Sequence, residues 1–228
     1  MKNVLKKILL TKFIANTFIK SLLRLHSFTY DLAGLYSSIL NNGVHPKHKI
    51  MKHKEWFLDN IKKEWVVLDV GCNTGMMPEL MSGKASFVYG IEIDNSMIEK
   101  AKKERNSYNI EFICADATIY DYSKHKSIDC VTLSNVLEHI EYRVEFLKKL
   151  IQNVKWNNKK NFLIRVPMID REWIAVYKKN LGLDYRLDKT HFIEYTFEEF
   201  QNELENANIC INSYHIKFGE IYAICESK

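Results

Sequence analysis

The sequence of 228 residues contains no apolar run that approaches the roughly 20 residues of a membrane-spanning helix. It has no C-x-x-C pair and no histidines at zinc-site spacing, so we predict no metal site. Its five cysteines are scattered through apolar runs, which is typical of buried free thiols in a reducing compartment. No small-residue cleavage site follows the N-terminal apolar stretch, which argues against a signal peptide. These absences predict a cytoplasmic protein.

Charge does not single out one class of partner. Lysine and arginine number 33 against 28 acidic residues, which gives a net charge of +5. An excess of this size suits an anionic partner but is also common on ordinary protein surfaces. No Lys/Arg-rich patch with interleaved aromatic residues stands out in the main part of the chain. The sequence therefore argues against a nucleic acid as the partner.

Residues 1–45 are predicted to form a helical extension. Such a helix can pack on the main domain or cover its site, or it can lie as a basic amphipathic helix on an anionic membrane surface. A contact in an oligomer is a third interpretation, and the pattern leaves all three open, together with the oligomeric state. The apolar residues at helical spacing are Val4, Leu5, Ile8, Leu9, Phe13, Ile14, Phe18, Ile19, Leu22 and Leu23.

A break around Asn42-Gly43 and Pro46 separates this extension from a main domain over residues 46–228. A helix is predicted over residues 48–61, before the main pattern begins. From residue 65 onward, short β-rich segments alternate with helical ones. We predict strands over 65–70, 87–93, 110–114, 129–133, 161–166, 209–217 and 220–225.

The helices of the main domain carry recognisable start signals. Capping boxes at Ser96–Glu99 and Thr196–Glu199 open two helices, and a third over 136–154 is predicted to break near Glu141. Strands that alternate with helices predict an α/β fold: a Rossmann-like, doubly wound, mostly parallel seven-stranded sheet. The hairpin formed by the last two strands adds an antiparallel edge strand.

The most informative stretch is the glycine turn after the first strand. Gly71 permits a tight bend and a close approach of the backbone to a ligand. A dinucleotide fingerprint needs glycine two and five positions later, where Asn73 and Met76 stand, so the spacing argues against a nicotinamide dehydrogenase. The alternative pattern Asp-x-Gly-x-Gly-x-Gly matches at Asp69, Gly71 and Gly75. Asn73 departs from it, but asparagine tolerates a left-handed backbone.

Two further acids follow the next two strands. Glu92 ends the second strand, about 20 residues beyond the turn, where a carboxylate can accept both hydroxyls of a ribose. Asp116 follows the third strand, where a carboxylate can accept from an adenine amino group. Because ligands of open α/β sheets bind at the carboxyl ends of the strands, we expect all these acids to gather at one site.

These segments together resemble class I S-adenosylmethionine-dependent methyltransferases over about residues 47–226. VLDVGCNTG at 67–75 is similar to their first motif, and YGIEID at 89–94 to their second. DCV at 129–131 with NVLEHI at 135–140 resembles the small-molecule O-methyltransferase branch, as in ubiquinone-type enzymes. The short segment at 45–49 also resembles methyltransferases of bacterial and archaeal surface-polysaccharide clusters, which keeps a glycan acceptor open.

The resemblance implies S-adenosyl-L-methionine as cofactor and S-adenosyl-L-homocysteine as product. It implies that residues of the glycine turn surround the methionyl part, that Glu92 holds the ribose and Asp116 the adenine, and that Asn135 lines the methyl-transfer cleft. The cofactor-binding residues expected in this way are Asp69, Gly71, Cys72, Asn73, Gly75, Glu92, Ile93, Asp116, Ala117 and Asn135.

Methyl transfer to a hydroxyl requires the removal of a proton, which a histidine can accept near neutral pH. His139 lies just after the fourth strand, and His191 lies between the fifth strand and the next helix. We predict both as catalytic candidates, with a structural hydrogen-bonding role as the alternative for each. An insertion over residues 168–195 holds aromatic and arginine side chains that suit a lid over the site; an ordinary surface helix is the alternative.

The resulting hypothesis is a methyltransferase that acts on a hydroxyl oxygen of a small molecule or glycan. One alternative is an RNA methyltransferase. Base-methylating relatives of this fold carry an Asn/Asp-Pro-Pro-aromatic motif after the fourth strand, whereas this chain has Ser134-Asn135-Val136-Leu137 there. A second alternative is a non-catalytic regulator that binds S-adenosylmethionine.

Overall fold

The computed structural model describes residues 11–227, which form two compact units. The first unit comprises the described residues up to Lys52 together with Trp173–Tyr185, and the second comprises the rest. The sequence-based boundary at residue 45 therefore differs from the structural one, and part of the predicted insertion belongs to the first unit. Val4, Leu5, Ile8 and Leu9, which the helical prediction included, lie outside the described residues.

Three helices build the first unit: α2 (Lys12–Leu40), α3 (Lys47–Met51) and α8 (Trp173–Asn180). Lys178 of α8 is buried, and its Nζ donates to Ser27 Oγ of α2 at 2.8 Å. Large apolar side chains are exposed along α2: Phe18, Leu22, Leu25, Phe28, Tyr30, Leu35, Tyr36, Ile39 and Leu40. Within the described part of the chain, no helix has both the length and the apolar character needed to cross a membrane.

The helix predicted over 48–61 is two helices in the structure. Lys52 adopts a left-handed backbone with φ of 55°, so α3 ends there and α4 (His53–Asn60) begins directly after it. This residue is also where the two units meet in the sequence.

A seven-stranded sheet forms the second unit, with the strand order β3-β2-β1-β4-β5-β7-β6. The first five strands run parallel to one another, and β7 runs antiparallel to both of its neighbours. β7 therefore lies between β5 and β6, and β6 is the edge strand. The strands are β1 (Val66–Val70), β2 (Phe87–Glu92), β3 (Ile110–Cys114), β4 (Ile128–Ser134), β5 (Trp156–Pro167), β6 (Ile209–Lys217) and β7 (Glu220–Ser227).

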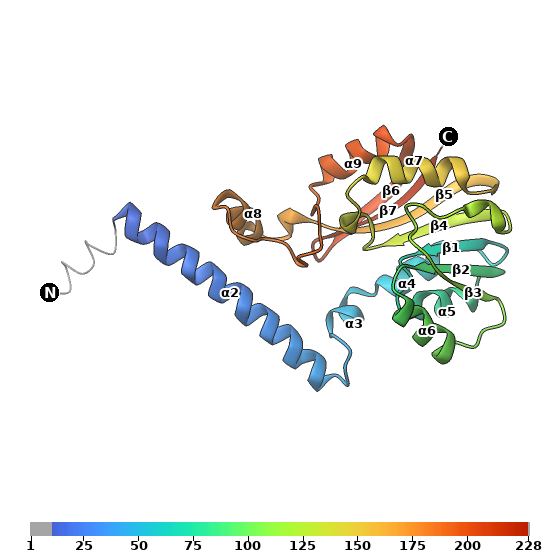
Figure 1. Ribbon diagram of the computed structural model, residues 1–228. Helices are drawn as coiled ribbons and strands as arrows, with labels where there is room; N and C mark the ends of the chain where they lie inside the picture. Colours follow the sequence, from blue (N-terminus) through green and yellow to red (C-terminus); the bar gives the residue numbers. More distant parts are fainter. Residues whose placement is uncertain (1–10, 228) are drawn as a thin grey trace. The chain divides into compact units, whose positions relative to one another are not determined.

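Helices cover both faces of the sheet (Figure 1). α4, α5 (Met76–Ser82) and α6 (Asn95–Glu104) lie on one face, and α7 (Arg143–Asn153) and α9 (Phe197–Asn206) lie on the other. Each face has its own apolar core, one around Phe57 and Met81 and a larger one around Phe162 and Phe200. Because the central strands are buried on both faces, they are nearly continuous apolar runs, which is why the sequence identified them. The structure confirms the predicted Rossmann-like class.

Local start signals agree with the structure at one helix and differ at another. The capping box at Thr196 and Glu199 opens α9. The N-cap of α6 is instead Asp94, whose side chain accepts a hydrogen bond from Ser96 N, so the N-cap predicted at Ser96 is wrong by two residues. The predicted break near Glu141 is confirmed: a 3-10 turn, η2 (Leu137–His139), precedes α7.

The glycine that opens α5 provides a test of this packing. Gly75 has φ of 72°, and a Cβ there would lie 2.6 Å from Phe112 Cζ and 2.9 Å from Ala101 Cβ. Gly75→Ala should destabilise the protein, because a left-handed backbone costs roughly 1–2 kcal/mol and overpacking roughly 1–3 kcal/mol more. Urea unfolding followed by circular dichroism measures this change.

Gly83→Ala is the matched control, since Gly83 has a right-handed backbone and its nearest neighbour to a Cβ is 3.4 Å away. It should change stability by no more than about 0.5 kcal/mol. Equal effects of the two substitutions would contradict the packing described here.

Candidate functional site

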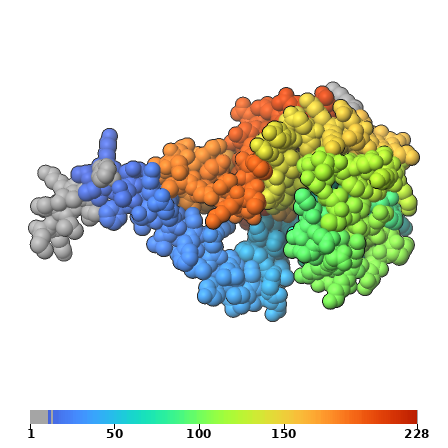
Figure 2. Space-filling model, in the orientation of Figure 1, coloured from blue at the N-terminus to red at the C-terminus, as the bar shows by residue number. Residues whose placement is uncertain are grey.

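A cavity of about 880 Å³ opens at the carboxyl ends of the parallel strands. It lies within the second unit, and its size is in the range of ligand pockets, roughly 300–1,000 Å³. Figure 2 shows α7 (yellow), which contributes to its wall, at the surface next to the segment around η1 (Tyr122–Lys124, light green). Eight of the residues predicted from the sequence line this cavity: Gly71, Asn73, Glu92, Ile93, Asp116, Ala117, Asn135 and His139.

The turn after β1 has the backbone that the sequence predicted. Gly71 and Cys72 donate their N–H groups to Ile91 O at 2.8 and 3.0 Å, which ties the turn to β2. Gly71 has φ of 72°, and Asn73, which stands where the pattern has glycine, has φ of 49°. Asn73 Oδ1 accepts from Thr74 N at 2.7 Å, so its side chain supports the left-handed conformation. The turn keeps its shape without the missing glycine.

Three residues of the first motif lie beneath the cavity and do not line it. Gly75 caps α5, and Cys72 is buried, with a thiol pKa raised by burial. Asp69 is buried on β1 and accepts a hydrogen bond from Thr132 Oγ1 of β4 at 2.5 Å. Burial raises the pKa of Asp69 to about 7, although that hydrogen bond opposes the shift. In this structure these residues shape the turn from below.

Glu92 is held by three backbone donors. Its Oε1 accepts from the N–H groups of Ile93 at 2.8 Å and Asp94 at 3.1 Å, and its Oε2 accepts from Asn73 N at 3.0 Å. A carboxylate has about four acceptor positions, so capacity for further donors from a ligand remains. The side chain is therefore fixed in orientation before any ligand arrives.

Asp116 is fixed in a similar way after β3. Its Oδ1 accepts from both the N–H and the hydroxyl of Thr118, at 2.8 and 2.7 Å. Both hydrogen bonds fall on one oxygen, which leaves Oδ2 as an acceptor in the cavity wall.

The loop after β4 forms the opposite wall. Asn135 has φ of 55° and donates its N–H to Arg165 O at 2.9 Å. Its Oδ1 is buried and has no hydrogen-bond partner among the described residues. Gly71 lies against this loop: a Cβ at Gly71 would be 2.7 Å from Val136 Cγ2.

The two predicted histidines lie together at this wall. The ring centroids of His139 and His191 are 4.7 Å apart, with the rings nearly perpendicular. His139 is exposed to the cavity, whereas His191 is buried behind it. Partial burial lowers the pKa of His139, and the neighbouring His191 ring adds to the effect. The structure thus brings together two side chains from distant segments of the sequence.

Several cavity residues carried no sequence signal. Tyr142 lies near His139 and Phe192 follows His191, but neither belongs to a motif; Val136 belongs to the NVLEHI segment, yet nothing in the sequence marked it as a site residue. Lys149 of α7 reaches the cavity from a helix that sequence patterns describe only as amphipathic. Its Nζ donates to Thr118 O at 2.7 Å and so links α7 to the Asp116 loop.

Comparisons with known proteins agree with this geometry. Residues 68–157 match the family model described as a methyltransferase domain. The chain is 28% identical over 121 residues to a ubiquinone biosynthesis O-methyltransferase of Coxiella burnetii, covering 52% of this chain and 50% of that protein. It is 27% identical over 150 residues to the protein of the same name from Glaesserella parasuis, covering 63% and 62%. The chain thus spans about half to three fifths of the length of these curated relatives.

The fold is also that of a solved S-adenosylmethionine-dependent methyltransferase from Aquifex aeolicus. The two structures have a TM-score of 0.58 with 17% sequence identity, covering 82% of this chain and 97% of the other.

The buried carboxyl of Asp69 predicts a pH-dependent contribution to stability. Its folded pKa of about 7 lies above its ordinary value of 3.8, so the folded state keeps this proton to higher pH than the unfolded state does. The contribution is therefore fully present below about pH 4 and is lost as the pH rises to about 7, by on the order of 4 kcal/mol. Its two electrostatic neighbours are the Thr132 hydroxyl and the Glu92 carboxylate.

Asp69→Asn should remove this dependence, because an amide does not titrate. The unfolding free energy of the wild type minus that of Asp69→Asn should fall between pH 4 and pH 7, as urea titrations at several pH values would measure. A difference that is constant over this range would contradict the raised pKa.

Proposed function

We propose that this chain, whose central domain belongs to the class I S-adenosylmethionine-dependent methyltransferases, transfers a methyl group to a hydroxyl oxygen of a small-molecule or glycan acceptor. The observation that carries the proposal is the cavity in which Gly71, Glu92 and Asp116 line one side and Asn135 and His139 line the other. The relatives named above, which are O-methyltransferases of ubiquinone biosynthesis, support an oxygen acceptor.

The cavity fits S-adenosylmethionine by its own chemistry. The turn at Gly71 and Asn73 forms part of the cavity wall, and the Glu92 and Asp116 carboxylates keep acceptor positions for hydroxyl and amino donors. When bound, the cofactor supplies a methyl group on a positively charged sulfur. Glu92 would hold the ribose hydroxyls, Asp116 the adenine amino group, and the turn at Gly71 and Asn73 the methionyl part.

The acceptor would occupy the side of the cavity formed by His139, Tyr142 and Phe192. Tyr142 and Phe192 are largely exposed aromatic side chains, which suits contact with a ring or a sugar face. We propose that His139 and His191 assist the removal of the proton from the acceptor hydroxyl, because His139 is the imidazole in the cavity wall and His191 adjoins it. Alignment of the reacting atoms by the rigid walls provides the remaining rate enhancement.

The charge of the cavity favours this proposal over an RNA methyltransferase. Four carboxylates line it (Glu92, Asp116, Glu141 and Glu145) against one lysine, Lys149. Such a lining attracts a cationic cofactor and repels a phosphate backbone.

Tight RNA binding that weakens steeply with salt would favour the RNA alternative instead. Cofactor binding without transfer to any acceptor would favour a non-catalytic regulator.

Calorimetry with S-adenosylmethionine and S-adenosylhomocysteine, followed by transfer of radiolabelled methyl to panels of phenols, catechols and glycans, tests the proposed function. Binding together with labelled hydroxyl-containing products is the expected result. A protein that binds neither compound would overturn the proposal.

Glu92→Ala should weaken the binding of S-adenosylhomocysteine by at least about tenfold. The substitution removes an ionised acceptor, and each hydrogen bond to a charged group is worth roughly 1.5–3 kcal/mol. Isothermal titration calorimetry measures the affinity. Glu111→Ala is the control, since Glu111 is an exposed residue on β3 outside the cavity lining and its loss should leave the affinity unchanged. An unaltered affinity in Glu92→Ala would remove Glu92 from the cofactor site.

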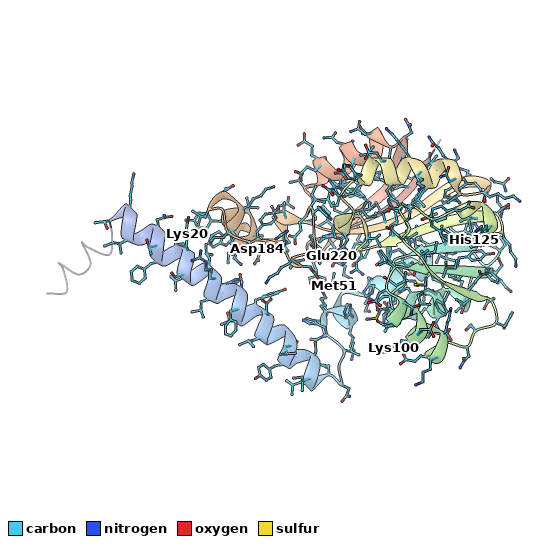
Figure 3. The ribbon with its side chains drawn as sticks, viewed as in Figure 1. Lys20, Met51, Lys100, His125, Asp184 and Glu220 are labelled. Atoms are coloured by element: carbon cyan, nitrogen blue, oxygen red, sulfur yellow. The ribbon has the colours of Figure 1, made fainter. Side chains whose placement is uncertain are left out.

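His139→Ala should lower kcat by about 10²–10⁴-fold while changing cofactor affinity little, because the ring acts on the acceptor. His125→Ala is the control. His125 precedes β4 and so lies at the amino ends of the parallel strands, whereas the cavity opens at their carboxyl ends, where Glu220 pairs with Pro167 (Figure 3). Steady-state kinetics with the identified acceptor gives both parameters. Unchanged turnover in His139→Ala would exclude the residue from the mechanism.

A further inference from the structure

Three side chains at the acceptor end of the cavity form a cluster of potential metal ligands. Glu138 and His139 lie in η2 after β4, and His191 lies in the loop before α9. One ligand atom from each residue lies within 4.8 Å of the others. Two histidines and a carboxylate are the ligand set of many catalytic zinc sites and of non-haem iron sites, which keep further positions open for water or substrate.

Both histidine rings are already oriented by partners on their outer nitrogens. His139 Nδ1 is 2.9 Å from Thr190 Oγ1, and that hydroxyl in turn donates to Asp188 Oδ1 at 2.7 Å. Since the Thr190 proton is directed to Asp188, Thr190 accepts from His139 Nδ1–H. His191 Nδ1 is 3.2 Å from Glu194 Oε1, a fully buried carboxylate.

This arrangement is the one found around metal-binding histidines. A ligating imidazole almost always donates its other ring N–H to a carboxylate, carbonyl or similar acceptor, which fixes the tautomer and the ring direction. With Nδ1 engaged on each ring, Nε2 is the nitrogen that remains to bind an ion. An isolated general base would not need the second, buried ring to be oriented in the same way.

Glu138 provides the independent observation. Its side chain is completely buried, and neither carboxylate oxygen accepts a hydrogen bond from another described residue. A buried carboxyl group whose oxygens have no partner is costly in either protonation state, unless hydrogen bonds or a metal ion complete its environment. The nearby cation Arg165 is engaged in an ion pair with Glu220, with Nε 2.5 Å from Oε2. The two oxygens of Glu138 therefore have no hydrogen-bond partner among the described residues. A cation bound at the same time by the two histidines would supply the missing partner.

We infer that Glu138, His139 and His191 bind one divalent transition-metal cation, such as Zn²⁺, Mn²⁺ or Fe²⁺. The cation faces the cavity through His139, so its open positions take the acceptor oxygen. It lowers the pKa of a bound hydroxyl: the O–H bond breaks, the proton passes to solvent, and the electron pair stays on the oxygen. In this inference the two histidines assist the removal of the proton by holding the cation, and not by accepting the proton themselves. The acceptor's part in this inference rests on the proposed function, whereas binding of the cation does not.

Direct metal binding tests the inference. The full chain is stripped with a chelator and titrated with Co²⁺, whose visible absorption reports coordination by nitrogen ligands; Zn²⁺ affinity follows from competition with a chromogenic chelator. One cation per chain is expected. Glu138→Gln, which keeps the size of the side chain but not its charge, and His191→Ala should each weaken binding by at least about tenfold, and His125→Ala should not.

A variant of an outer partner makes the test specific for this geometry. Thr190→Val removes the acceptor of His139 Nδ1 without touching a ligand, and it should weaken metal binding by about 10–100-fold. S-adenosylhomocysteine affinity, measured in parallel on every variant, should stay within about twofold of the wild type, which shows that each variant is folded.

The possible outcomes separate the two proposals. Absence of a stoichiometric cation, or equal metal affinity in the wild type and Glu138→Gln, overturns the inference even where S-adenosylhomocysteine binds and the proposed function stands. A cation that binds as expected in a chain that ignores S-adenosylhomocysteine supports the metal site and overturns the proposed function.

Discussion

The close approach of Gly71 to Val136 determines how the rest of the site is built. These two residues belong to the turn after β1 and the loop after β4, strands that are neighbours at the centre of the sheet. With no Cβ at Gly71, the loop packs directly on the turn, and both walls of the cavity are fixed by the same contact. Asn135 and His139 are then held opposite Glu92 and Asp116, because all four residues lie at or just beyond the carboxyl ends of parallel strands. A larger residue at position 71 would separate the two walls at the point where the reacting groups must meet.

Much of this arrangement follows from local sequence, because its elements are parallel strands buried on both faces. β3 and β6 begin and end at the predicted residues, and Glu92 and Asp116 lie in the cavity wall as their places at strand ends imply. Asp69 was expected around the cofactor, but it lies below the cavity, bonded to Thr132. Motif spacing specifies where an acid stands on a strand, but the alternation of side chains and the neighbouring strand decide which way it faces.

Contacts between distant segments had no sequence signal. His191 follows His139 by about fifty residues, so no ligand spacing could pair them. Tertiary bonds bring them together: Phe192 N donates to Glu138 O at 2.7 Å, and the buried Glu194 carboxylate is bonded to Arg171, to Leu187 N and to His191. Glu194 thus holds the segment before α9 in shape, and the bonds of Phe192 N to Glu138 O and of Thr190 to His139 attach that segment to η2. The same bonds explain why part of the predicted insertion belongs to the second unit, with its backbone tied to the site.

Two buried carboxyl groups near the strand ends show how burial alone does not define a role. Asp69 and Glu138 both have raised pKa values, about 7 and about 8, and in both cases burial is the main cause. Asp69 has a hydroxyl donor inside the protein, so its environment is complete without a ligand. Glu138 has no such donor among the described residues, yet it adjoins two imidazoles whose outer nitrogens are already bonded. The inferred cation would complete the environment of Glu138, whereas Asp69 needs no ligand, so the difference between the two buried acids lies in their hydrogen-bond partners and not in their burial.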